Sequence, residues 1–217
     1  MNYIIANWKS NKTISEGLEW VESVGPKLEK NNELTIIVCP PSLYLSEVSK
    51  TAQITGSVLK VGSQNISPFS FGSYTGEETA EMVKQFGDYS IIGHSERRKN
   101  FGETDEILAE KVKLAISGGL TPIFCVQNEN TPIPEGVTVV AYEPVFAIGT
   151  GVADTPQNAN DVCSKILSTH DGIEVLYGGS VTSENAKAFL EQQNISGLLI
   201  GKAALDAEEF VKIVQLA

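Results

Sequence analysis

The stretch Thr138–Gly151, TVVAYEPVFAIGTG, decides how the rest of the chain is interpreted. It begins with an apolar, β-branched run, which is typical of the end of a buried strand. Glu143 follows and is held extended, because the ring of Pro144 disfavours the helical conformation for the residue before it. A loop of small residues then leads to Thr155 and Pro156, an N-cap and a first-turn proline that predict a helix. A carboxylate at a strand end beneath such a loop predicts a catalytic base under a lid; a surface glutamate before an ordinary turn is the alternative.

Seven further apolar runs have the composition of buried strands, and helical patterns separate most of them. Short apolar strands that alternate with amphipathic helices are typical of a parallel sheet with both faces covered. Eight such units in 217 residues suit a closed (β/α)8 barrel, in one domain over residues 1–217, better than an open doubly wound sheet. The expected strands are Tyr3–Ala6, Leu34–Cys39, Leu59–Gly62, Tyr89–Gly93, Thr121–Val126, Thr138–Tyr142, Glu174–Tyr177 and Leu198–Ile200, and the expected helices include Glu78–Phe86, Glu106–Ser117, Pro156–Ser168, Glu184–Gln192 and Glu208–Gln215.

The connection between the fifth and sixth expected strands is an exception to this alternation. Residues 127–136 include asparagines, a threonine, a glycine and two prolines, and no helix can form there. About nine or ten extended residues, at roughly 3.3 Å each, can cross the height of a barrel but cannot also wind a helix. The helix after the fifth strand is therefore expected to be missing, with Ile133, Pro132 and Pro134 as the only apolar cover that this segment provides.

The composition excludes several classes of function. A net charge of −11 argues against binding to nucleic acid and to an anionic membrane surface, which attract basic proteins. There is neither a signal peptide nor an apolar segment near about 20 residues, so a cytoplasmic protein without a membrane span is expected. The three cysteines, Cys39, Cys125 and Cys163, are widely spaced and are expected to be reduced thiols.

Polar residues and glycines follow the carboxyl ends of the expected strands. In a parallel barrel these ends meet at one rim, where barrel enzymes have their active sites. A rim with a lysine, a histidine and a glutamate predicts proton abstraction next to a carbonyl, with a Schiff-base Lys9 as the alternative chemistry. The two histidines, His94 and His170, have no HxxxH or cysteine-pair context, so no metal site is expected. The strand-end residues are Asn7, Lys9, Gln64, Asn65, His94, Glu143, Gly178, Gly179, Ser180, Gly201 and Lys202.

Four motifs together resemble the triosephosphate isomerase family: NWK at 7–9, GHSERR at 93–98, AYEPVFAIGTG at 141–151 and YGGSV at 177–181. They follow the family's order, and their combination is far more specific than any one of them. The resemblance implies a TIM barrel that interconverts dihydroxyacetone phosphate and D-glyceraldehyde 3-phosphate, in glycolysis and gluconeogenesis, without a cofactor. The alternative is a catalytically impaired relative that binds phosphosugars or proteins, which would be expected to have lost the acid, the base or the lid glycines.

The resemblance also implies roles at the rim. Glu143 would remove a proton from carbon, while a neutral His94 would polarise the carbonyl, as in the family's own acid–base pair. Lys9 would stabilise the developing negative oxygen, and Glu96 is expected to be buried and to pair with Lys9. Ser95 is expected to cap a helix whose positive end favours the neutral imidazole. The implied catalytic set is Lys9, His94, Glu143 and Glu96, with Asn7 as an orienting group.

The loop after Glu143 matches the family's lid. Ile148 from this lid and Leu199 from the last strand would form an apolar clamp that desolvates the carboxylate and strengthens it as a base. Lys202 stands where the family usually has a glycine, which should be tolerated because the backbone donor can remain. The lid is Pro144, Val145, Phe146, Ala147, Ile148, Gly149, Thr150 and Gly151, and the phosphate-binding positions are Asn7, Lys9, Gly149, Ser180, Gly201 and Lys202.

The loop Asn65–Gly76 is too rich in aromatic residues to remain in water. Its motif GSYTGE resembles the family's interdigitating dimer loop. The resemblance implies a homodimer in which Thr75 reaches toward the partner's site and Glu77 meets Arg97 across the interface.

Overall fold

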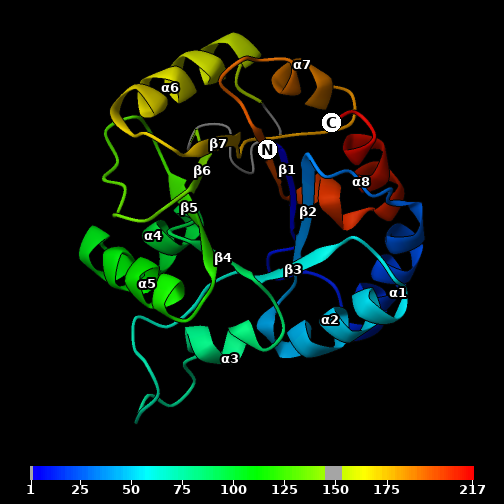
Figure 1. Cartoon of the computed structure of the whole chain (residues 1–217), viewed down its shortest axis with the longest axis vertical. Coiled ribbons are helices and arrows are strands. Elements are labelled where there is room, and N and C mark those ends of the chain that lie inside the picture. The colour runs from blue at the N-terminus through cyan, green and yellow to red at the C-terminus, as the bar shows by residue number, and fades with distance from the viewer. Residues whose placement is uncertain (1, 145–152) are drawn as a thin grey trace.

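The computed structural model describes residues 2–144 and 153–217. Its eight strands form a closed barrel in which each strand pairs in parallel with the next and β8 closes on β1 (Figure 1). The expected (β/α)8 barrel is thereby confirmed. The strands are β1 (Asn2–Asn7), β2 (Leu34–Cys39), β3 (Lys60–Ser63), β4 (Tyr89–Ile92), β5 (Thr121–Val126), β6 (Val139–Tyr142), β7 (Glu174–Tyr177) and β8 (Gly197–Ile200).

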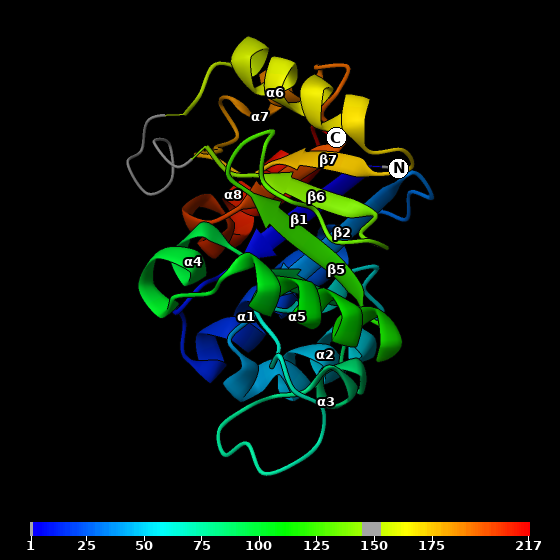
Figure 2. The ribbon, with the colours of Figure 1, turned by 90° about the vertical axis from the view of Figure 1, so that its left-hand side faces the viewer.

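The helices surround the barrel in chain order (Figures 1 and 2). Several begin at the caps that the sequence provides: Thr13 and Glu16 form a capping box before α1, and Thr155 accepts a hydrogen bond from the N–H of Asn158 at the start of α6. The α-helices are α1 (Ile14–Val24), α2 (Leu45–Ile54), α3 (Ala80–Lys84), α4 (Ser95–Phe101), α5 (Asp105–Ser117), α6 (Pro156–Thr169), α7 (Ala186–Leu190) and α8 (Ala207–Val214). Short 3-10 helices are η1 (Gly25–Lys27), η2 (Ser42–Tyr44) and η3 (Lys202–Leu205).

Alternate residues of each strand belong to two separate apolar cores. One core fills the inside of the barrel and includes Ile5, Ile91 and Ile123. The other lies between the barrel and its helices, and includes Ile4 and Ile92. Neighbouring residues of a strand point to opposite faces, and because both faces of the sheet are covered, the strands are mostly apolar.

The connection from β5 to β6, residues 127–138, contains no helix, and the ring of helices in Figure 1 is interrupted between α5 and α6. The outer face is nevertheless well packed: Phe124 of β5 is 1% exposed, and every residue of β6 is buried. Val137 is buried in the same core against which Ile133 packs, and the Arg98 guanidinium lies 5.8 Å from the centre of the Phe124 ring. The sequence analysis expected the apolar residues of this segment to be Ile133, Pro132 and Pro134, beside the flanking helices, and Val137 adds a further buried residue to that cover.

Two helices are shorter than the sequence pattern predicts. Thr79 caps α3 by accepting a hydrogen bond from the N–H of Met82, so the helix begins after it rather than at residue 78. Before α7, the Asn185 side chain bonds to its own loop, which delays the helix from residue 184 to Ala186. No helix in the described part of the chain is long and apolar enough to cross a membrane.

Candidate active site

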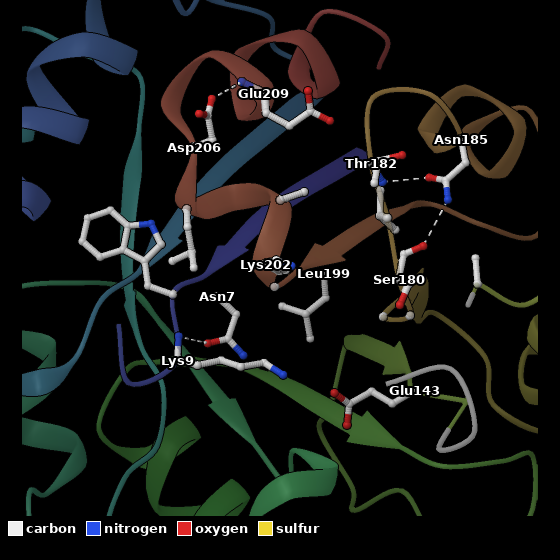
Figure 3. A pocket seen from close by; sticks show the side chains of 18 of the residues that line it. Asn7, Lys9, Glu143, Ser180, Thr182, Asn185, Leu199, Lys202, Asp206 and Glu209 are labelled. Atoms are coloured by element: carbon white, nitrogen blue, oxygen red, sulfur yellow. Dashed lines mark hydrogen bonds between the residues drawn. The ribbon is translucent and has the colours of Figure 1, made fainter. Parts of the chain in front are cut away.

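A cavity of about 1060 Å³ opens at the rim formed by the carboxyl ends of the strands (Figure 3). Residues that follow β1, β4, β6, β7 and β8 line it, as expected for a parallel barrel. Gln64 and Asn65, which follow β3, are not among its described lining residues. The predicted site residues that line it are Asn7, Lys9, His94, Glu143, Gly178, Gly179, Ser180, Leu199, Gly201 and Lys202.

Glu143 is a buried carboxylate at the end of β6, with a side chain that is only 1% exposed. Its backbone N–H donates to the carbonyl oxygen of Val126, which extends the β5–β6 pairing to this residue. One carboxylate oxygen, Oε2, accepts from the backbone N–H of Ser95 at 2.8 Å, and Oε1 lies 2.9 Å from Nε2 of His94. Two hydrogen-bond donors from the β4 side therefore hold this carboxylate.

His94 is the N-cap of α4, so the prediction that Ser95 caps this helix is wrong. The N–H of Glu96 donates to Nδ1 of His94 at 3.2 Å. Because Nδ1 accepts, the imidazole proton lies on Nε2, which faces Glu143. The first turn of α4 thus orients the imidazole with Nε2 toward the carboxylate.

Lys9 follows β1 and extends toward Glu143 across the floor of the cavity (Figure 3). Its Nζ lies 2.6 Å from Oε1 of Glu96, and its backbone N–H donates to the Asn7 side chain at 3.0 Å. Lys9 has φ of 52°, a left-handed conformation that is strained for a residue with a Cβ and that recurs at functional sites. The Lys9–Glu96 pair is present as predicted, but Glu96 is not buried: its side chain is 44% exposed.

Cys125 of β5 lies beneath the glutamate inside the barrel. Burial, together with the Glu143 charge, raises the pKa of the Cys125 thiol well above its usual value, so the thiol stays protonated. Sequence reasoning treated this cysteine only as a reduced thiol. The sequence evidence for its place near Glu143 was its position one residue before the end of β5, where the side chain points into the barrel.

Glycines and a polar loop form the opposite wall of the cavity. At Gly179 a Cβ would lie 2.1 Å from the Tyr177 hydroxyl oxygen, so no other residue fits without rearrangement. Asn185, which the sequence analysis missed, donates from Nδ2 to the Ser180 carbonyl and accepts the Thr182 N–H. It fixes the turn that presents Ser180. The only sequence signal for Asn185 was its position near the start of the predicted helix Glu184–Gln192, just after the loop that contains Ser180.

Several predicted lid residues lie outside the described ranges, which leaves their calls as expectations. They are Val145, Phe146, Ala147, Ile148, Gly149, Thr150 and Gly151. Pro144 is described and buried directly after Glu143. Of the expected apolar clamp, only Leu199 is therefore described; it is 3% exposed and lines the cavity.

The predicted dimer loop projects from the barrel between β3 and α3 (Figures 1 and 2). Thr75 and Glu77 are exposed on it. Arg97 has a partner within the chain, because its Nε donates to Glu103 at 2.6 Å. Glu103 also binds Lys111 at 2.6 Å, so Arg97, Glu103 and Lys111 form a cluster that the sequence analysis missed. The cluster gave no sequence signal because its members are separated along the chain.

No group of three histidine, cysteine or acidic side chains that could hold a metal ion occurs in residues 2–144 and 153–217. Cys39, Cys125 and Cys163 are free and buried there.

Comparison with known proteins gives consistent matches. A family model described as "Triosephosphate isomerase" matches residues 2–138 and 134–217, and the two segments meet in the connection before β6. A triosephosphate isomerase of Aquifex aeolicus (strain VF5) is 37% identical over 242 residues, covering 97% of this chain and 97% of the relative. Triosephosphate isomerases of Shewanella sp. (strain W3-18-1) and Shewanella baltica are each 36% identical over 252 residues, covering 99% of this chain and 96% of each relative.

Proposed function

Since the chain belongs to the triosephosphate isomerase family, we propose that Glu143 is the base of its reaction and His94 the neutral acid. The chain is an intramolecular aldose–ketose isomerase that interconverts dihydroxyacetone phosphate and D-glyceraldehyde 3-phosphate, a reaction of glycolysis and gluconeogenesis. The observation that carries the proposal is the Glu143 carboxylate, which is 1% exposed, lines a cavity and lies 2.9 Å from Nε2 of His94.

Substrate binding has to replace one of the hydrogen bonds to the Glu143 carboxylate before this group can accept a proton. Ser95 and His94 each contact one oxygen of the carboxylate, so Oε1 is occupied by His94 before substrate binds. A substrate carbonyl oxygen that takes over the Nε2–H of His94 releases Oε1 of Glu143. The same exchange places the imidazole donor on the oxygen that becomes negative when the proton leaves carbon, and it frees Oε1 to accept that proton.

Lys9 supplies the positive charge for the enediolate oxygen. Its Nζ is paired with Glu96 at 2.6 Å, and this contact holds the ammonium in position at the rim. A Schiff-base lysine requires an unprotonated, desolvated amine, and the carboxylate partner opposes that state. This contact favours the isomerase role of Lys9 over the aldolase-like alternative.

The phosphate end of the substrate is assigned to the glycine-rich wall of the cavity. Backbone N–H groups at Ser180, Gly201 and Lys202, with Gly149 from the lid, would bind the phosphate oxygens. Gly201 supports this assignment, because its Cα carries no side chain where a Cβ would lie 3.4 Å from Cε of Lys9. The wall and the lysine are thus close enough to bind the two ends of one triose phosphate.

A homodimer and a cytoplasmic location complete the proposal. Three aromatic residues of the projecting loop are exposed: Phe69 by 43%, Phe71 by 61% and Tyr74 by 45%. Burial of such a patch against a second copy removes it from water, and Glu77 would then approach Arg97 of the other protomer. Light scattering at micromolar concentration tests the dimer, and a fully active monomer would contradict it.

A coupled assay of the purified protein with D-glyceraldehyde 3-phosphate tests the function. We expect rapid, saturable formation of dihydroxyacetone phosphate. Binding of a phosphate ligand without turnover would instead favour the catalytically impaired relative. An assay in the reverse direction controls for the coupling enzyme.

A further inference from the structure

Lys202 is an exposed lysine in the wall of the cavity, at the start of η3. It follows Gly201, whose Cα lies against the Lys9 side chain, so its backbone belongs to the wall assigned to the phosphate. The family pattern asks only for the backbone N–H at this position. The side chain is an additional group that the backbone role leaves unexplained.

The charges around the cavity make this side chain distinctive. Lys9 and Lys202 are the lysines among the described residues that line the cavity, and arginine is absent from that described set. Lys9 is paired with Glu96 at 2.6 Å. In the described part of the chain, no carboxylate lies within 4.0 Å of the Lys202 ammonium, although Asp206 lines the same cavity four residues later.

The acids on this wall are engaged in structural contacts. Asp206 accepts the N–H of Glu209 at 2.8 Å and caps α8. Glu209 accepts the Ser183 N–H at 2.7 Å and its hydroxyl at 3.0 Å. Figure 3 shows both acids above Lys202, on the side away from Glu143. Together with the net charge of −11 on the chain, these two acids disfavour the approach of a phosphate dianion.

We propose that the Lys202 side chain is a specificity-determining group for the phosphate end of the substrate. Its ammonium binds the outer phosphate oxygens and offsets the repulsion of Asp206 and Glu209, in addition to the backbone donor. The inference rests on the proposed function of the cavity. Its alternative is a solvated lysine that contributes only its backbone, as most surface lysines do.

The test compares Lys202→Gln, Lys202→Arg and the matched control Lys212→Gln, an exposed lysine of α8 that does not line the cavity. An exposed charge–charge contact is modest, so we expect Lys202→Gln to raise the KM for glyceraldehyde 3-phosphate about fivefold at low salt, with kcat unchanged. Lys202→Arg should restore the KM. The dependence of KM on ionic strength should be weaker in Lys202→Gln than in the wild type.

Two further measurements distinguish the loss of a phosphate contact from a general distortion of the cavity. The kcat/KM for unphosphorylated D-glyceraldehyde should be equal in Lys202→Gln and wild type, because this substrate lacks the group that Lys202 binds. Calorimetric binding of inorganic phosphate should weaken about fivefold in Lys202→Gln and not in Lys212→Gln. Calorimetry of phosphate binding does not require turnover. If the wild type were inactive, the proposed function would be overturned, and the phosphate affinities would still decide the role of Lys202. A change below twofold in both KM and phosphate affinity would overturn the role of the Lys202 side chain.

Discussion

The two connections on either side of β5 differ sharply. Between β4 and β5 the chain builds two helices, α4 and α5, and one of them carries His94 at its N-cap. Between β5 and β6 it crosses in residues 127–138 without a helix. Yet Glu143, at the end of β6, is held from the side with the helices, by His94 and Ser95. The comparison teaches that the proposed reacting groups are positioned by strand ends and by α4, while the other connection serves to close the outer core.

The largest expected effect separates a glutamate at the rim from a glutamate within the short connection. Glu143→Gln keeps the shape of the side chain but removes the base, so kcat should fall by about 10²- to 10⁴-fold. Glu129→Gln removes only a contact to Lys165 at 3.0 Å and should change kcat less than about twofold. Steady-state kinetics of both variants checks this. Similar losses in the two variants would remove the distinction between the rim and the connection.

The two histidines provide a second matched pair. His94→Gln can still donate a hydrogen bond but cannot release and regain a proton as the proposed acid does, so kcat should fall about 100-fold or more. His170→Gln, at the half-buried C-cap of α6 and not in the described lining of the cavity, should have nearly wild-type kcat. Both variants are assayed with saturating glyceraldehyde 3-phosphate. A wild-type kcat in His94→Gln would show that another group polarises the carbonyl.

Shortening a buried side chain in the short connection should lower the stability of the protein without changing kcat. Val137 is 6% exposed and packs in the outer core, so Val137→Ala should lower the free energy of unfolding by about 1–3 kcal/mol. No predicted catalytic residue lies in this segment, and kcat should remain within about twofold of wild type. Urea unfolding and the isomerase assay are the measurements. A large loss of kcat at an unchanged unfolding free energy would mean that the connection reaches the site.

The smallest expected effect concerns local opening. The outer core beside β5 lacks a helix on one side, so amide protons of Ile123–Val126 should exchange faster than those of β4, Ile91–Gly93. The buried outer faces of β5 and β6 limit this difference. Native-state hydrogen exchange compares the two strands directly. Equal protection would mean that Val137, Ile133 and Arg98 replace the helix completely.

Much of this architecture could be predicted from the sequence, because it depends on local patterns. Uniformly apolar strands, the caps at Thr13 and Thr155, and polar residues at strand ends are each readable within a few residues. They predicted the barrel and brought Lys9, His94 and Glu143 to one rim.

The remaining details depend on contacts between distant residues. The exposed Glu96, the Asn185 hydrogen bonds and the Glu103–Lys111 pair require knowledge of which elements meet. The N-cap of α4 was misassigned by one residue because an imidazole nitrogen can accept a backbone N–H as a serine oxygen does. Lys202 was noticed from the sequence only as a departure, and the charges near it became apparent in the folded chain.

The central claim is that Glu143, held from the β4 side, moves the substrate proton. The direct measurement is isomerisation of glyceraldehyde 3-phosphate in D2O, followed by NMR for the wild type, Glu143→Gln and Glu129→Gln. Wild type and Glu129→Gln should incorporate solvent deuterium at the reacting carbon at similar rates, while turnover and incorporation in Glu143→Gln should both fall at least about 100-fold. Turnover with deuterium incorporation above a tenth of the wild-type rate in Glu143→Gln would contradict the account.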